Sequence, residues 1–256
     1  MPKAPVDPDE SRAEAVADVK RLMRLARTGA LATLEAQGGA PLTTLIGVAS
    51  DFDGAPLFLM SMLSRHTRNL ANDARASLLL TGRPERGDPL NHPRVTLSGR
   101  VERCAAPRAK ARYLQRNPKA GLYAGFADFA LYQLRVEDVH FNGGFGRAAP
   151  LTRSEVLTSR DGEAALAEAE EQLIAEVNAL GAAQLAPLAG RRLSRPVWRA
   201  IGLDADGLDL AAGGRAARAQ FAAPAHDPDA WRAGLEQLLA AGSRAGHADS
   251  GRLKRQ

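Results

Sequence analysis

Strand-like runs follow one another in the first quarter of the chain with only short turns between them. Residues 30–35, 41–50 and 56–61 are rich in apolar and β-branched side chains, and Gly-containing turns near residues 38 and 54 separate them. A crossover between parallel strands needs about a dozen residues or more. These turns are too short for one, which excludes a doubly wound parallel sheet and favours an antiparallel meander or small barrel.

Helical periodicity and further strand patterns fill the rest of the chain. Apolar residues recur at helical spacing over residues 11–27 and 107–117, and an acidic Ala-Glu run predicts a third helix over 163–180. Strands are predicted over 76–81, 94–103, 198–203, 208–211 and 218–221, and two strands turning at Glu137-Asp138 over 129–142. A last helix is predicted over 228–240.

The change of composition near residues 153–162 predicts two domains. We expect a flexible N-terminus at residues 1–10, a split β-barrel domain at 11–153, a small α+β domain at 163–242 and a disordered basic tail at 243–256. The predicted fold class is therefore α+β.

Charge and cysteine content narrow the function. The net charge is +5, and residues 83–119 hold ten Arg or Lys against three acids, which favours an anionic small molecule. Aromatic residues make up only 5%, so bases would have little to stack on and nucleic acid is not an expected partner. Cys104 is the single cysteine, and the histidines lack metal-ligand spacing, so no disulfide or metal site is expected. Without a signal-like or membrane-spanning apolar run, the protein is expected to be cytoplasmic.

A stretch of hydroxyls and cations at residues 61–75 lies between two of the predicted strands. Ser64 is placed to cap a helix, so that backbone N–H groups, Thr67 and the guanidinium groups of Arg65 and Arg68 can surround one point. Such a point suits a phosphate, because free N–H groups at a helix start carry partial positive charge. The alternative interpretation is a capped surface helix with a solvated basic face.

The pattern at residues 64–70 and 73–78 resembles the flavin-binding split-barrel proteins related to pyridoxamine phosphate oxidase, and most closely their haem-utilisation branch. Segments in the expected order support this resemblance from about residue 12 to 150: 29–34, 51–54, 94–99, 123–129 and 143–148. Residues 163–242 are similar to the small α+β domain often appended in that branch.

The resemblance implies an FMN-binding homodimer with the flavin between subunits. In the matching positions, the phosphate would be held at the helix start, the ring would lie along one strand and the end of the next, and a cation would reach it from the partner subunit. The implied cofactor-binding residues are Ser64, Arg65, His66, Thr67 and Asn69 for the phosphate, Thr43, Thr44, Leu45 and Ser61 along the strands, and Arg94 from the partner.

Departures from the family pattern modify this expectation. Thr43 and His66 stand where the oxidase has Arg and Lys, which predicts a weaker, pH-sensitive phosphate site. The late Arg-x-His pair is missing, so oxidation of pyridoxamine phosphate is not expected. The Asn-x-x-His stretch of the haem branch is also incomplete, because Gly181 follows at the histidine position.

Three functions remain open from the sequence. The first is an FMN-dependent oxidoreductase acting in haem utilisation, with the redox chemistry supplied by the cofactor. The second is a flavin- or haem-binding protein for storage, sensing or delivery, without turnover. The third is an adaptor that has lost its cofactor. No catalytic residue is assigned, because the sequence carries no nucleophile motif.

Overall fold

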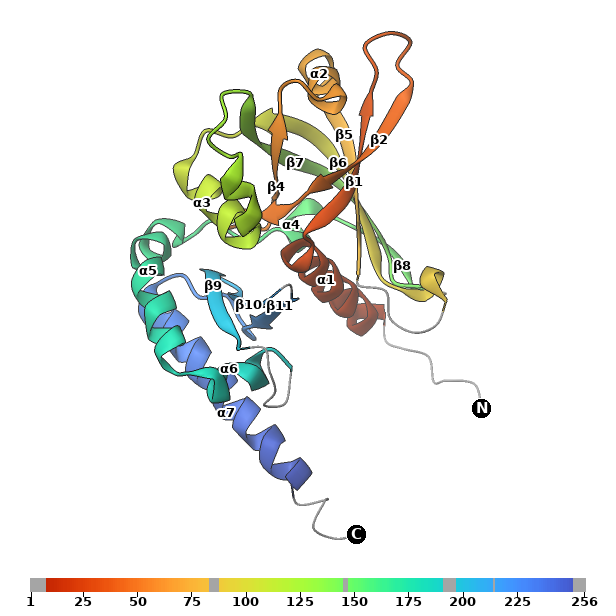
Figure 1. Cartoon of the computed structure of the whole chain (residues 1–256). Helices are drawn as coiled ribbons and strands as arrows, with labels where there is room; N and C mark the ends of the chain where they lie inside the picture. The colour runs from red at the N-terminus through yellow and green to blue at the C-terminus, as the bar shows by residue number, and fades with distance from the viewer. Residues whose placement is uncertain (1–7, 83–87, 145–146, 191–196, 214, 251–256) are drawn as a thin grey trace. The chain divides into compact units, whose positions relative to one another are not determined.

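The computed structural model describes residues 8–82, 88–144, 147–190, 197–213 and 215–250 (Figure 1). The chain divides into two compact units, the first ending at Thr158 and the second beginning at Ser159. In the described residues, the first unit contains a curled sheet with its helices, and the second contains a small sheet with three helices.

The elements of the first unit follow the predicted order closely. They are α1 (Pro8–Leu25), β1 (Thr28–Leu34), β2 (Pro41–Gly47), β3 (Ala49–Ser50), β4 (Pro56–Ser61), α2 (Arg65–Asn72), β5 (Arg75–Thr81), η1 (Pro89–Asn91), β6 (Arg94–Arg103), α3 (Pro107–Arg116), η2 (Pro118–Leu122), β7 (Phe129–Asn142), β8 (Ala148–Leu151) and α4 (Arg153–Val156).

The sheet of this unit curls until its two ends meet. Its strand order is β2-β1-β5-β6-β7-β4-β3, with β8 added to β7, and every paired strand is antiparallel. β2 and β3 stand at opposite ends of this order, yet only Val48 separates them in the chain. The ends of the sheet must therefore come together. The predicted antiparallel split barrel and the α+β class are confirmed.

The prediction of two strands over residues 129–142 was wrong, because β7 is a single bent strand. Its pairing with β6 shifts register: Ser98 faces Asp138, whereas Gly99 faces Val136. Glu137 is the extra residue of a β-bulge, and an extra residue bends and twists a strand without ending it. The acidic pair is exposed because of this bulge.

An apolar core fills the barrel, and α1 covers part of it with Val19 and Met23, which are almost fully buried. The end of α1 is fixed by Arg24, whose side chain is only 3% exposed. Its guanidinium donates to the carbonyl oxygens of Asp51 and Phe52, each at 2.7 Å. A buried cation needs such acceptors to offset its lost hydration. Arg24 thus joins α1 to the turn between β3 and β4.

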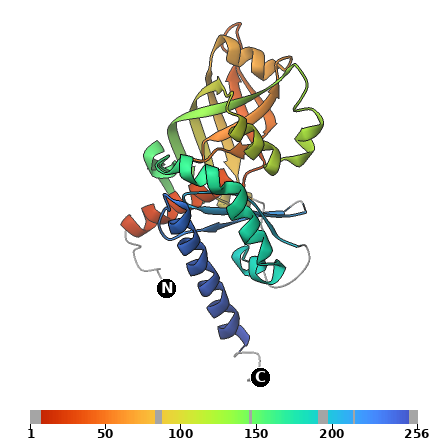
Figure 2. The same ribbon diagram turned by 90° about the vertical axis from the view of Figure 1, so that its left-hand side faces the viewer.

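The second unit is an antiparallel three-stranded sheet with helices. Its elements are α5 (Glu163–Ala179), α6 (Ala182–Leu188), β9 (Arg199–Asp204), β10 (Gly207–Ala212), β11 (Arg215–Gln220) and α7 (Pro228–Ser250), with sheet order β11-β10-β9. α5 and α7 run side by side in both views (Figures 1 and 2). α7 continues beyond the predicted helix over 228–240. The residues after position 240 include alanines, which favour a helix, and no proline, which would end it. Part of the predicted tail is therefore helical, and residues 251–256 lie outside the described residues.

A buried ion cluster lies on the small sheet. Arg218 donates to Asp204 at 2.6 Å and to Asp209 at 3.1 Å, and its side chain is 3% exposed. The carbonyl oxygen of Asp204 also accepts the indole N–H of Trp231 on α7 at 3.1 Å. The indole bond joins α7 to β9. The ion pairs join β11 to β9 and β10, and losing one partner would be strongly destabilising because it leaves a buried charge unpaired.

Among the described residues, no helix has both the length and the apolar character that crossing a bilayer requires.

Gly99 offers a test of the bulge. A Cβ atom at this position would lie 1.9 Å from the carbonyl oxygen of Arg135 on β7. We expect Gly99→Ala to lower the free energy of unfolding by about 2–3 kcal/mol, because the two strands must separate to admit it. Urea denaturation would measure the change. Gly121→Ala is the control, since nothing lies within 4 Å of a Cβ there, and equal stability of the two variants would contradict the bulge geometry.

Candidate functional site

A cluster of hydroxyls and one imidazole lies at the start of α2. Ser64 occupies the N-cap position with extended backbone angles, as predicted, but its side chain does not cap the helix. Its Oγ instead donates to the carbonyl oxygen of Ser61 at 2.6 Å and lies 2.9 Å from both Thr67 Oγ1 and His66 Nε2. The other ring nitrogen of His66 lies 3.1 Å from Thr44 Oγ1 on β2. β2 and the start of α2 are thereby brought together.

The number of donors and acceptors in this cluster determines where its hydroxyl and imidazole hydrogens lie. The single hydrogen of Ser64 Oγ goes to Ser61, so Thr67 Oγ1 and His66 Nε2 must donate to Ser64. A neutral His66 then lacks a hydrogen on Nδ1, which accepts from Thr44. Burial lowers the pKa of His66 below its ordinary value of 6.5, which agrees with a neutral ring near pH 7.

Positive potential at this cluster comes from the helix start and from Arg65. The first N–H groups of a helix have no partner within it and attract anions. Arg65 forms an ion pair with Glu35, but its side chain is 63% exposed. Exposed ion pairs contribute only about 0–1 kcal/mol. Arg65 can therefore leave Glu35 for an anionic ligand at little cost.

The structure brings only some of the predicted site residues together. Asn69 is buried and donates to Thr33 Oγ1 on β1 at 3.1 Å, so its amide stabilises the helix against the barrel. Thr43 and Leu45 lie on the exposed face of β2, opposite to the side of Thr44. Arg94 begins β6 and donates to the carbonyl oxygen of Leu90 at 2.8 Å. Among the described residues, neither Arg94 nor Asn69 is hydrogen-bonded to the hydroxyl cluster.

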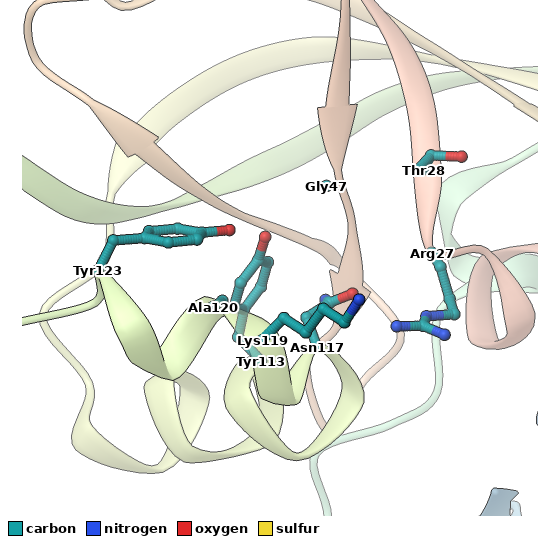
Figure 3. Close-up of a pocket in the computed structure, with 8 residues that line it drawn as sticks. All are labelled: Arg27, Thr28, Gly47, Tyr113, Asn117, Lys119, Ala120 and Tyr123. Carbon is teal, nitrogen blue, oxygen red and sulfur yellow. The ribbon is translucent and has the colours of Figure 1, made fainter. Parts of the chain in front are cut away.

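A cavity that was not predicted from the sequence lies where β2 ends. Its volume is about 390 Å³, and it is lined by Arg27, Thr28, Gly47, Tyr113, Asn117, Lys119, Ala120 and Tyr123. In Figure 3 the two tyrosine hydroxyls point toward one another, and the side chains of Arg27 and Lys119 extend toward each other. In the sequence, the cavity is marked by polar side chains on α3 and η2. Helical spacing alone does not distinguish side chains that line a cavity from those on a solvent-exposed helix face.

Tyr113 occupies the gap between the two ends of the sheet. A Cβ atom at position 47 of β2 would lie 2.6 Å from its hydroxyl oxygen, so only glycine leaves room for it. Burial, followed by the neighbouring Tyr123, raises the pKa of Tyr113 to about 12, although a backbone hydrogen bond with Leu59 of β4 opposes this rise. Tyr113 therefore stays protonated at neutral pH and can donate to a ligand.

The lining of the cavity favours a negatively charged or polar ligand. Arg27 and Lys119 form no ion pair with any described residue, and none of the described residues that line the cavity carries a carboxylate. Asn117 is held in place by donation from its Nδ2 to the carbonyl oxygen of Val48 at 3.1 Å. Volumes of about 300–1,000 Å³ are typical of sites for small organic molecules. The cavity thus joins two cations with two phenols in a space of that size.

A curled antiparallel sheet whose ends meet beside a polar cluster and a cavity defines a split-barrel protein. Residues 9–157 match the family model described as CREG, beta-barrel, and the chain belongs to this family. The finer relationship to pyridoxamine phosphate oxidase remains a prediction.

Two solved structures are similar over most of the chain. The protein Atu2129 from Agrobacterium tumefaciens, of unknown function, is 36% identical; the match covers 93% of this chain and 100% of that one, with a TM-score of 0.77. A heme binding protein from Mycobacterium smegmatis is 28% identical over 90% of this chain and 98% of that one, with a TM-score of 0.53.

A curated relative matches about half of the chain. The chloroplastic non-canonical heme oxygenase HOZ of Arabidopsis thaliana is 28% identical over 142 residues, which is 54% of this chain. The match spans 43% of the length of that protein. The comparisons thus place this chain among split-barrel proteins with haem-binding relatives.

The ionisation of His66 tests whether an anion binds at the start of α2. We expect the imidazole pKa to lie below 6.5 in the free protein, so that protonation withdraws stability as the pH falls below that value. Adding FMN should raise this pKa, because a nearby phosphate favours the imidazolium. Proton NMR of the ring would measure both, with His66→Gln assigning the signal. A pKa unmoved by saturating FMN would place the phosphate elsewhere.

Proposed function

We propose that this protein is an FMN-binding, oxidoreductase-like split-barrel protein that acts in haem utilisation. The main support is the cluster of Thr44, Ser64, His66 and Thr67 at the start of α2. A heme binding protein that is 28% identical over 90% of this chain supports the role in haem utilisation. Hydroxyls, an imidazole and free helix N–H groups are the donors that a phosphate requires.

In this proposal the phosphate lies against Ser64, Arg65, His66 and Thr67. The hydroxyl of Ser64 turns from the carbonyl oxygen of Ser61 to the phosphate, and Arg65 leaves Glu35. Asn69 acts indirectly, since it fixes α2 to β1.

The ring lies along the backbone of Thr43, Thr44 and Leu45 and near Ser61, with Arg94 of a second subunit at its polar edge. FMN supplies electron transfer when bound, and the chain supplies orientation and charge. Since β2 continues to Gly47, the cavity would receive a second ligand near the flavin. Its two cations favour an acidic substrate.

Haem is the second ligand class that the relatives support. The printed names of the Mycobacterium smegmatis and Arabidopsis thaliana proteins concern heme binding and heme oxygenation. The alternative function is therefore a flavin- or haem-binding protein for storage, sensing or delivery, without turnover. Oxidation of pyridoxamine phosphate is not proposed, because the Arg-x-His pair of that enzyme is missing after β7.

We also propose that the protein is a homodimer built on the outer face of β2, β1 and β5. Leu45, Ala30 and Leu79 form one cross-strand row, and Thr43, Ala32 and Ser77 form the next. All six side chains are uncharged, and Leu45 is 77% exposed. A continuous uncharged face with an exposed leucine is typical of a surface that a partner covers.

An absorbance titration with FMN, followed by haemin, tests the proposed ligands. Saturation at one FMN per subunit is the expected result, and reduction of the bound flavin by a nicotinamide donor would favour the oxidoreductase over the binding protein. If haemin binds and FMN does not, the alternative function takes its place. If the protein binds neither FMN nor haemin, the proposal is overturned and the third function, an adaptor that has lost its cofactor, is favoured.

Removing two hydroxyls tests the phosphate position. We expect Ser64→Ala combined with Thr67→Ala to weaken FMN binding about 30-fold or more, because two hydrogen bonds to the phosphate are lost at about 1–2 kcal/mol each. Titration calorimetry would measure the affinity. Asn72→Ala, at the other end of α2, is the matched control and should bind as the unmodified protein does. Unchanged affinity in the double variant would refute this position.

A charge on the outer face tests the dimer. Leu45→Glu should shift the protein from dimer to monomer in sedimentation velocity, because a carboxylate covered by an uncharged interface loses its hydration without gaining a partner. Leu90→Glu is the control, since Leu90 is 68% exposed but belongs to η1. A dimer that persists in Leu45→Glu, or a monomeric unmodified protein, would contradict the proposed interface.

A further inference from the structure

The turn between β4 and α2 has little apolar burial to hold its shape. Met62 and Leu63 are 39% and 73% exposed. The turn contains a bond from the backbone N–H of Ser64 to the carbonyl oxygen of Ser61 at 3.2 Å and one from the N–H of Leu63 to Ser61 Oγ at 3.1 Å. Its geometry, and hence the position of the α2 start, depends on hydrogen bonds.

Asp128 makes two further bonds to this turn. Its carboxylate accepts from Ser61 Oγ at 2.6 Å, and its carbonyl oxygen accepts from the N–H of Met62 at 2.7 Å. Asp128 directly precedes β7, where Phe129 pairs with Ser61. The two bonds thus extend the β4–β7 ladder beyond its last residue pair and into the turn.

The carboxylate also decides how Ser61 uses its single proton. Because Ser61 Oγ donates to Asp128, its lone pairs remain to accept from Leu63. The carbonyl oxygen of the same residue accepts from the backbone N–H of Ser64, a bond that does not involve the hydroxyl proposed to turn to the phosphate. Hydrogen bonds at Ser61 therefore connect Asp128 with Ser64 at the start of α2.

Charge alone does not explain a carboxylate at this place. A negative group near a candidate anion site opposes the binding of an anion. A short hydrogen bond to a charged acceptor, however, is about twice as strong as one between neutral groups. The benefit of Asp128 is therefore geometric, and its charge acts in the opposite direction.

We propose that Asp128 is a positioning residue that holds the Ser61–Ser64 turn in the shape in which the start of α2 receives an anionic group. This inference rests on the proposed anion site. Asp128 does not touch the anion and acts through Ser61. The residues that carry it belong to segments far apart in the sequence, which the pairing of β4 with β7 brings together.

Two substitutions separate geometry from charge. Asp128→Ala removes the acceptor, so FMN affinity should fall about tenfold or more. Asp128→Asn keeps an acceptor oxygen and removes the charge, so its affinity should stay within about threefold of the unmodified protein or exceed it. Asp138→Ala, which removes an exposed acid within β7, is the matched control and should leave the affinity for FMN and sulfate unchanged. Titration calorimetry with FMN and with sulfate would measure each affinity.

A double-mutant cycle and amide exchange complete the test. Ser61→Ala should weaken FMN binding to a similar degree, and Ser61→Ala combined with Asp128→Ala should add little, because both break the same bond. Hydrogen exchange of the Met62 and Leu63 amides should quicken in Asp128→Ala, with or without ligand. Unchanged exchange, or Asp128→Ala binding FMN normally, would overturn the inference. Absence of FMN and sulfate binding by the unmodified protein would overturn the anion site instead, and exchange would still report on the turn.

Discussion

The meeting of the two ends of the barrel sheet is the constraint on which the rest of the first unit depends. Val48 is fully buried and alone connects β2 to β3, which stand at opposite ends of the strand order. A sheet that must return to itself within one residue cannot stay flat. Its two ends are not fully joined by backbone bonds, and Tyr113 occupies the space between β2 and β4.

Both candidate ligand features lie beside this gap. At one end, Thr44 of β2 contacts His66 at the start of α2, directly after β4. At the other end, Gly47 of β2 and Tyr113 line the cavity. A site between separated strands leaves backbone groups for a ligand without breaking the fold, because the core lies on the inner face.

Buried arginines add hydrogen bonds to the apolar contacts where the helices join the barrel. Arg24 donates to backbone carbonyls of the turn between β3 and β4, and Arg116 of α3 donates to the carbonyl oxygen of Leu25 at 2.6 Å. Carbonyls at the end of a helix carry partial negative charge and lack partners within it. The end of α1 is thus satisfied by α3, and α3 is held at the position from which Tyr113 reaches the gap.

The sequence by itself determined most of the strands, their antiparallel pairing and the position at which α2 begins, although it divided β7 into two strands. These features follow from short turns and residue periodicity, which act within a few residues along the chain. The bulge at Glu137, the burial of Asn69 against Thr33 and the bond from Ser61 to Asp128 were decided only by the tertiary structure. Each joins residues more than 30 positions apart, and no local pattern records which distant strand will supply the partner. The cavity around Tyr113 is of the same kind, because its space exists only once β2, α3 and η2 are brought together.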